Sequence, residues 1–340
     1  MRSAPDFWGR EPGLAATLLL PIGAAWDAAG RLRRALARPY HAPVPVICVG
    51  NLIVGGAGKT PIALALAARL IARDVAVHFV TRGYGGRLAG PVQVDKARHD
   101  AAAVGDEALL LATRAPCWVA RDRAAGIAAA AASGAAAIVL DDGFQNPGVA
   151  NTLALIVVDA AYGFGNRRVM PAGPLRESLR RGLARADGAV LLAGDGQAQT
   201  AWPSGVDAGR PVVPAMLAPL AGERFAGSRV VAFAGIGRPE KFFATLRGLG
   251  VDLVAARRFP DHHPFSPAEL AELRRIAARE HARLVTTAKD FVRVPPEARD
   301  GIEVLEVAVR WLDLPALDGL LNPDVLSARV NGRGPNRHRR

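Results

Sequence analysis

The chain alternates between short apolar runs and segments with helical periodicity. The first apolar run, residues 44–51, is unbroken and ends in glycine and asparagine, which is typical of a strand buried in a parallel sheet. Further strands are expected over residues 75–81, 115–120, 135–140, 153–158 and 188–193, and helices over residues 61–72, 106–114 and 121–133. Strands that alternate with helices predict a mostly parallel α/β sheet with helices on both faces.

A second α/β unit follows a segment in which this periodicity fades. Glycine, proline and alanine dominate residues 194–229, so the domain boundary is expected there. Beyond it, strands are expected over residues 230–234, 251–257, 283–287 and 302–309, and helices over residues 239–249 and 267–280. We therefore expect a larger domain over residues 43–215 and a smaller α/β domain over residues 216–325.

The N-terminal segment, residues 1–42, has a different pattern. Residues 14–29 are apolar but are interrupted by Pro21 and Asp27, so the run is too broken for a membrane-spanning helix. Arginines follow it, and the excess of the +12 formal net charge is concentrated near the two ends of the chain. This combination predicts a helix that lies on an anionic membrane surface. The alternative is a helix packed on the protein's own core.

Composition adds two expectations. Residues 326–340 are rich in arginine and contain no acid, and are expected to form a basic disordered tail. Cys48 and Cys117 stand apart, without zinc-ligand spacing, which indicates a cytosolic protein without a disulfide framework. Nothing in the sequence indicates an obligate protein partner.

The most specific local motif is a glycine-rich loop between an expected strand and an expected helix. It consists of Ile53, Val54, Gly55, Gly56, Ala57, Gly58, Lys59 and Thr60. Glycines let backbone N–H groups close around phosphate oxygens, Lys59 can reach the β- and γ-phosphates, and the Thr60 hydroxyl can ligate Mg²⁺. The general motif has glycine where Ile53 stands, and Gly55 and Gly56 can supply the flexibility instead. The loop predicts a P-loop NTPase-like domain.

A second element completes the expected ATP–Mg²⁺ site. The apolar strand at residues 135–140 runs into Asp141 and Asp142, as in a Walker B segment. Adjacent side chains on a strand point to opposite faces, so one carboxylate could face Mg²⁺ while the other orients the neighbouring loop. The sequence does not separate the two. Together the loop and the acid pair predict binding of ATP and Mg²⁺.

Several further motifs occur in a fixed order around these elements. They are G-N-L at residues 50–52, R-G-Y-G-G at 82–86, G-D-E at 105–107, D-D-G-F-Q at 141–145, G-P-L-R-E at 173–177, F-P-D-H-H at 259–263 and T-T-A-K-D at 286–290. This ordered set resembles the tetraacyldisaccharide 4'-kinase (lipid A 4'-kinase) family over roughly residues 51–290. The resemblance implies transfer of the γ-phosphate of ATP to the 4'-hydroxyl of a glycolipid, tetraacyldisaccharide 1-phosphate, to form lipid IVA. It also implies a peripheral enzyme on the cytoplasmic face of the inner membrane.

The resemblance implies a base for this reaction. Asp106 would accept the hydroxyl proton, and His262 from the second domain would pair with it when the cleft closes. An imidazole can balance and orient a carboxylate, which makes this pairing chemically reasonable. His263 is the rival for this role, and the sequence alone does not separate the two histidines.

The resemblance also implies binding roles. Residues implied to serve the nucleotide and Mg²⁺ are Lys59, Thr60, Glu107, Asp141 or Asp142, and Gln145. Residues implied to contact the acceptor or the transferring group are Asn51, Arg82, Tyr84, Arg121 or Arg123, Arg176 and Glu177, since arginine forks suit phosphate oxygens. One departure is Asn146, where many relatives are expected to have histidine. An amide does not titrate, so no acid–base role is expected at Asn146.

Two rival classes share the phosphate-binding loop. One is a membrane-associated P-loop ATPase switch without a glycolipid acceptor; such switches often carry lysine just before the double glycine, where Val54 stands here. The other is a nucleic-acid-binding NTPase, which the basic tail suggests. No RNA- or DNA-binding module signature is present, so no nucleic acid is expected as a partner.

Overall fold

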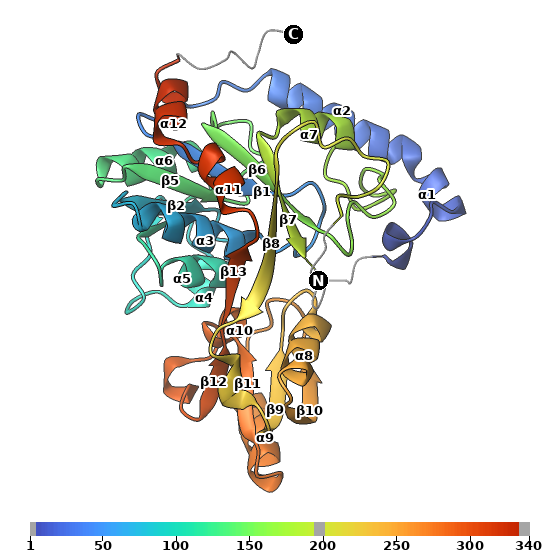
Figure 1. Ribbon diagram of the computed structural model, residues 1–340, viewed down its shortest axis with the longest axis vertical. Helices are drawn as coiled ribbons and strands as arrows, with labels where there is room; N and C mark the ends of the chain where they lie inside the picture. The colour runs from blue at the N-terminus through green and yellow to red at the C-terminus, as the bar shows by residue number, and fades with distance from the viewer. Residues whose placement is uncertain (1–4, 194–200, 333–340) are drawn as a thin grey trace.

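The computed structural model describes residues 5–193 and 201–332, and a nine-stranded sheet forms the centre of its larger domain (Figure 1). In spatial order the strands are β13 (Val307–Trp311), β8 (Val212–Pro219), β7 (Gly188–Ala193), β6 (Leu153–Asp159), β1 (Val46–Gly50), β5 (Ala137–Asp141), β2 (Val77–Thr81), β4 (Cys117–Val119) and β3 (Val92–Gln93). Only the two outer pairs, β13 with β8 and β3 with β4, are antiparallel. The carboxyl ends of the parallel strands therefore meet at one edge, where ligands bind in open α/β sheets.

Helices cover both faces of this sheet. Alternate residues of β1 enter different cores: Ile47 packs with α3 and α5, and Cys48 packs with α6 and α7. The large-domain helices are α3 (Lys59–Ile71), α4 (Ala101–Val104), α5 (Asp106–Leu111), α6 (Arg123–Ala132), α7 (Leu179–Arg185), α11 (Leu314–Leu320) and α12 (Pro323–Val330). This confirms the expected α/β class with a mostly parallel sheet and helices on both faces.

The smaller domain hangs below the larger one in Figure 1 and has a four-stranded parallel sheet of its own. Its strands, in spatial order, are β10 (Asp252–Arg258), β9 (Arg229–Ala234), β11 (Arg283–Thr287) and β12 (Ile302–Leu305). Its helical segments are η2 (Gly222–Phe225), α8 (Pro239–Gly248), α9 (Pro267–Arg279), α10 (Ala288–Phe291) and η3 (Pro296–Ala298). Phe243 of α8 and Leu273 of α9 pack on opposite faces of the sheet.

The boundaries of the smaller domain differ from the expected range 216–325. The expected strand at residues 302–309 is two strands in different sheets, because the chain leaves the small domain after β12 and returns as β13 to pair with β8. The strand β8 was not expected, since Pro214 and Pro219 lie within it and obscure its apolar pattern. The chain therefore crosses between the domains twice, once after β8 and once between β12 and β13.

The C-terminal expectation also needs correction. Residues 323–330 form α12, in which Arg329 Nη1 lies 3.3 Å from Asp187 Oδ1. A disordered tail is therefore wrong for residues 326–330, because an ion pair and the buried Leu326 hold this helix on the large domain. Asn331 and Gly332 form a turn after this helix, and residues 333–340 of the expected tail lie outside the described residues.

The N-terminal segment forms η1 (Asp6–Gly9), α1 (Leu14–Leu18) and α2 (Leu20–Ala35). Figure 1 shows α1 and α2 in blue on the outside of the large domain, beside α7, where Asp27 of α2 forms an ion pair with Arg181. Trp26 Nε1 donates a hydrogen bond to the Arg176 carbonyl at 3.2 Å. In the described parts of the chain, no helix is both long and apolar enough to cross a bilayer.

Candidate active site

The glycine-rich loop leaves the carboxyl end of β1 and enters α3, as the sequence predicted. Gly55 and Gly58 have φ of +109° and +81°, a region that favours glycine, so the loop needs glycine at these two positions. Ile53 is buried in the apolar core and forms a bridge with Leu175. The core therefore explains why isoleucine replaces the usual glycine: this residue packs inward, and the curvature begins at Gly55.

Lys59 lies at the mouth of this loop. Its Nζ is 3.4 Å from Asn51 Oδ1 and 3.7 Å from Asp142 Oδ1. Asn51 is fully buried, and its Nδ2 donates a hydrogen bond to the Gly55 carbonyl. Asn51 thus braces the loop and the lysine, although it was expected to contact the acceptor.

The second element supplies a buried carboxylate next to Thr60. The Thr60 hydroxyl donates to Asp141 Oδ2 at 3.0 Å, while Asp141 Oδ1 is buried and has no hydrogen-bond partner among the described residues. Burial, together with the charges of Glu107 and Asp142, raises the pKa of Asp141 to about 7. A buried acceptor without a partner and an acid with a raised pKa indicate a place that a cation would stabilise.

These residues fit Mg²⁺ held jointly with a nucleotide. In the described residues, no group of three His, Cys, Asp or Glu side chains could hold a metal by itself. Mg²⁺ is commonly bound by one or two carboxylates together with substrate phosphates and water. Asp141 and Thr60 offer such an incomplete set of oxygen ligands, and Glu107 lies near enough to affect the charge of Asp141.

Asp142 faces a different neighbour. Its φ of +53° turns the chain away from the strand, and the Arg176 guanidinium lies 3.2 Å from Asp142 Oδ1. Arg176 also donates to the Gln145 side chain and to the Ile53 carbonyl. Asp142 and Arg176 therefore connect the end of β5 to the glycine-rich loop.

Three other residues that were expected to bind ligand are also hydrogen-bonded or ion-paired within the protein. Gln145 donates to the Asn51 carbonyl at 2.9 Å, and Glu177 is buried beside Arg185, at 2.6 Å. Arg121 donates to the Arg87 carbonyl at 3.3 Å, on an exposed surface.

Arginines also gather around the acid pair. Burial and the positive charge of Arg82 lower the pKa of Arg123, and the negative charge of Asp142 opposes them. The buried Nε of Arg123 has no hydrogen-bond partner among the residues that the structure describes. Of the expected arginines, Arg176 and Arg123 thus act on Asp142, and Arg82 lies near Arg123.

The two domains meet at Asp106. Asp106 is buried at the first position of α5, and its Oδ2 lies 2.8 Å from His262 Nδ1 of the small domain. The Tyr84 ring lies 5.4 Å from the His262 ring, between centroids. His263 points elsewhere and pairs with Glu269 at 2.9 Å within its own domain. The structure thus brings His262, and not His263, to Asp106.

The charge of Asp106 is stabilised from several sides. Burial alone would raise its pKa, but the His262 hydrogen bond and the positive charges of Lys289 and Arg293 outweigh burial and hold the pKa below its usual value. The Asp106 backbone also begins a helix, whose N-terminus favours a carboxylate. Asp106 is therefore an oriented, ionised carboxylate at the contact between the two domains.

Two cations at this contact were missed by sequence reasoning. Lys289 Nζ lies 3.6 Å from Glu107 Oε1, and Arg293 Nε lies 3.4 Å from Asp106 Oδ2. Arg293 is almost fully buried and also donates to the Gly235 carbonyl and to Asp290. The T-T-A-K-D motif ends three residues before Arg293, so only its position after that motif could have indicated it.

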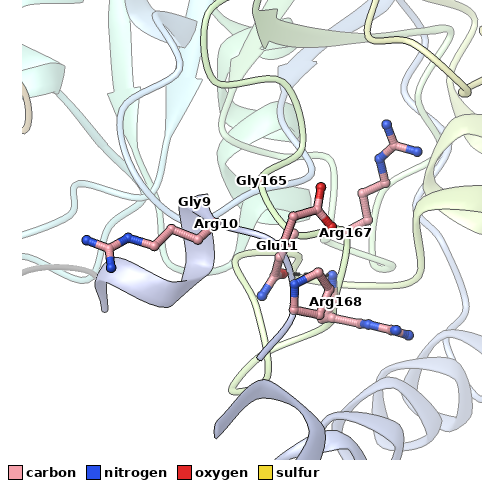
Figure 2. Close-up of a pocket in the computed structure, with 8 residues that line it drawn as sticks. Gly9, Arg10, Glu11, Gly165, Arg167 and Arg168 are labelled. Carbon is pink, nitrogen blue, oxygen red and sulfur yellow. Dashed lines mark hydrogen bonds between the residues drawn. The ribbon is translucent and has the colours of Figure 1, made fainter. Parts of the chain in front are cut away.

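The described residues also form a pocket away from this site. It is lined by residues 9–12 and 165–168, next to the N-terminal helices. Figure 2 shows the side chains of Arg10, Arg167 and Arg168 extending in different directions around it. None of its lining residues is among the expected site residues.

The fold and the site together define a P-loop nucleotide-binding enzyme with a second domain that closes one side of its site. A family model described as tetraacyldisaccharide-1-P 4'-kinase (LpxK) matches residues 15–325. The chain belongs to the tetraacyldisaccharide 4'-kinase family, and it is therefore a kinase.

Individual relatives agree over nearly the whole chain. The tetraacyldisaccharide 4'-kinase of Rhodospirillum centenum is 55% identical over 94% of this chain and 96% of its own length. That of Paramagnetospirillum magneticum is 52% identical over 92% of this chain and 96% of its own. A crystal structure of LpxK from Aquifex aeolicus in complex with ATP has a TM-score of 0.75 and 26% identity, covering 92% of this chain and 100% of that one. These matches give no support to an ATPase switch.

Proposed function

We propose that this chain transfers the γ-phosphate of ATP to the 4'-hydroxyl of tetraacyldisaccharide 1-phosphate, the reaction for which its relatives are named. The observation that carries the proposal is the Asp106–His262 pair, an ionised carboxylate at the contact between the domains. Asp106 is next in sequence to Glu107, whose charge acts on Asp141 beside Thr60. An ATPase switch needs no base for an alcohol, whereas a kinase with a sugar hydroxyl as acceptor does.

ATP binds with its phosphates over residues 55–60. Backbone N–H groups of the loop and the N-terminus of α3 hold the phosphate oxygens, and Lys59 moves from Asn51 to the β- and γ-phosphates. Asp141 and Thr60, with Glu107 nearby, hold Mg²⁺. When bound, Mg²⁺ offsets the negative charge of the phosphates during transfer.

Asp106 accepts the proton of the attacking hydroxyl. His262 donates from Nδ1 to Asp106 Oδ2 and so orients the carboxylate, while Arg293 balances its charge. The small domain excludes water above the loop, which limits idle hydrolysis of ATP. Lys59 stabilises the charge that develops on the transferring group.

Arginines near the acid pair suit the acceptor's own phosphate. Arg82 is exposed, and Arg123 is partly buried with an unpaired Nε, so both can turn a guanidinium toward phosphate oxygens. Arg121 and Tyr84 lie exposed nearby in the sequence and complete the acceptor side. The phosphate-binding loop is held by Arg176, which donates to the Ile53 carbonyl, and by Asn51, which donates to the Gly55 carbonyl. Gln145 in turn contacts Asn51 and Glu177.

The N-terminal helices place the enzyme on the membrane. Leu14 and Leu18 of α1 are 76% and 70% exposed, and Ile22 and Trp26 of α2 are 56% and 53% exposed; the spacing of four puts each pair on one face of its helix. Arginines follow on α2 and can reach anionic headgroups. The enzyme therefore acts as a peripheral protein on the cytoplasmic face of the inner membrane, where its glycolipid acceptor is held.

The test is direct. The purified protein is incubated with Mg²⁺, ATP and tetraacyldisaccharide 1-phosphate, and the lipid is analysed for a second phosphate by mass spectrometry. We expect the doubly phosphorylated lipid from the wild type, and a loss of at least ~100-fold for Lys59→Met. Hydrolysis of ATP by the wild type without any phosphorylated lipid would contradict the proposal.

A further inference from the structure

A second contact between the domains lies at the carboxyl end of β6. Asp159 is the last residue of this strand, and its side chain is only 4% exposed. Its Oδ2 accepts from Arg238 Nη1 and from Lys241 Nζ, both at 2.7 Å. Its Oδ1 accepts from the backbone N–H groups of Ala161 and Tyr162. Both oxygens are thus satisfied, and the carboxylate is fixed in position.

Both cations belong to the small domain. Arg238 caps α8, and Lys241 lies in its first turn. The Arg238 guanidinium also lies 4.8 Å from the centroid of the Tyr162 ring in the large domain. One carboxylate and one aromatic ring of the large domain therefore hold the same end of α8.

This contact and the Asp106–His262 contact lie on either side of the phosphate-binding loop. The loop follows β1, which has β6 on one side and β5 and β2 on the other. Between the two contacts, the small-domain loop at residues 235–238 approaches the phosphate-binding loop: a Cβ at Gly237 would lie 4.0 Å from the Gly56 amide nitrogen. The small domain thus lies over the loop and is tied down on both sides.

We propose that Asp159 is a positioning residue that latches the small domain over the phosphate-binding loop through Arg238 and Lys241, so that His262 reaches Asp106. The inference rests on the proposed function only because phosphate transfer is one of its readouts. Arg238 and Lys241 are 34% and 41% exposed, so both remain hydrated when the latch opens, whereas Asp159 is buried and needs them. The latch therefore favours closure and still permits opening for exchange of substrates.

The test uses two variants that break the latch from opposite sides. Asp159→Asn keeps an oxygen for the Ala161 and Tyr162 amides and removes the charge. The double variant Arg238→Gln with Lys241→Met removes the cations from the more exposed side. Glu240→Gln is the matched control, since Glu240 lies on α8 but pairs with Arg258 of the same domain.

Closure is followed by single-molecule FRET between dyes on Ser133→Cys and Ala278→Cys, two exposed positions in different domains. Phosphate transfer is measured in parallel at saturating substrates. We expect each latch variant to lower the closed population and to lower kcat by about tenfold, with the ATP Kd changed far less. Combining all three substitutions is expected to add little, because both variants remove one interaction.

The proposal is overturned if Asp159→Asn, or the double variant where Asp159→Asn does not fold, shows the closed population and kcat of Glu240→Gln. It is also overturned if the two variants have additive effects. A wild-type protein that closes on Mg²⁺–ATP but phosphorylates no lipid would contradict the proposed function, and the FRET comparison would still decide on the latch.

Discussion

Asp106 Oδ2 and His262 Nδ1 lie 2.8 Å apart although they belong to different domains. The carboxylate comes from the start of α5, and the imidazole comes from a turn in which His262 has a φ of +62°. A left-handed backbone at a residue other than glycine is costly and persists where the surrounding structure holds it. The proposed catalytic pair therefore depends on how the small domain contacts the large one.

The neighbouring histidines provide a matched pair for testing this relationship. His262→Gln is expected to lower kcat by ~10²-fold or more, because glutamine cannot balance the Asp106 charge as an imidazole does. His263→Gln is expected to change kcat by less than about threefold, since His263 pairs with Glu269 inside the small domain. Steady-state assays at saturating ATP and acceptor compare them. Equal losses in both variants would contradict the role given to His262.

Arg293 has a structural and a positioning role that can be separated. Arg293→Met leaves Asp290, which is fully buried, without its cation, and should lower the free energy of unfolding by about 3–5 kcal/mol. Adding Asp290→Asn removes the unpaired charge and should restore most of the stability, as measured by urea denaturation. Activity should remain low in the double variant, because Asp106 still lacks its second partner. Recovery of kcat together with stability would show that Arg293 acts on folding alone.

The buried acid at the end of β5 predicts a pH dependence of stability. Since the pKa of Asp141 is raised to about 7 in the folded protein, the folded state binds a proton that the unfolded chain releases near pH 4. The contribution of this group to stability therefore grows as pH falls from about 8 to 4, by about 1.4 kcal/mol for each unit between the two pKa values.

Asp141→Asn removes this dependence. Without nucleotide and with a chelator present, the variant should be more stable than the wild type at pH 8.5, and the difference should shrink at pH 6. Thermal unfolding followed by circular dichroism at the two pH values measures it. A difference that does not change between pH 6 and 8.5 would show that Asp141 does not titrate in this range, and would contradict the prediction.

The exposed apolar face of the N-terminal helices predicts membrane binding. Leu18→Glu combined with Ile22→Glu should weaken binding to vesicles containing anionic lipid by about tenfold or more, because it places charge on the face that enters the bilayer. Val325→Glu, at a 40% exposed apolar residue on α12, is the control and should bind normally. Vesicle flotation measures both, and equal loss in the control would argue against a specific membrane face.

The elements around the nucleotide could be predicted because their determinants are local. Strand β1, the glycine-rich loop and α3 follow one another directly in the sequence. The acid pair likewise lies at the end of β5. Local pattern also predicted most strands of both sheets, since most of them contain an apolar run between turns.

Residues whose roles depend on the contact between domains could not be predicted in this way. Asp159 and Arg293 meet partners far away in sequence, and no motif around either marks a buried ion pair. The pairing of β13 with β8 is equally long-range, so the sequence wrongly assigned residues 307–311 to the small domain. The choice between His262 and His263 depends on a backbone turn that composition does not reveal.

A single-turnover measurement tests the central claim most directly: that Asp106, completed by the small domain, takes the proton from the acceptor. Wild type and Asp106→Asn are mixed with γ-labelled ATP and tetraacyldisaccharide 1-phosphate at saturation, and ATP binding is measured separately. The account predicts transfer at least ~10²-fold slower in Asp106→Asn with nearly unchanged ATP affinity. Near-normal transfer in that variant would contradict it.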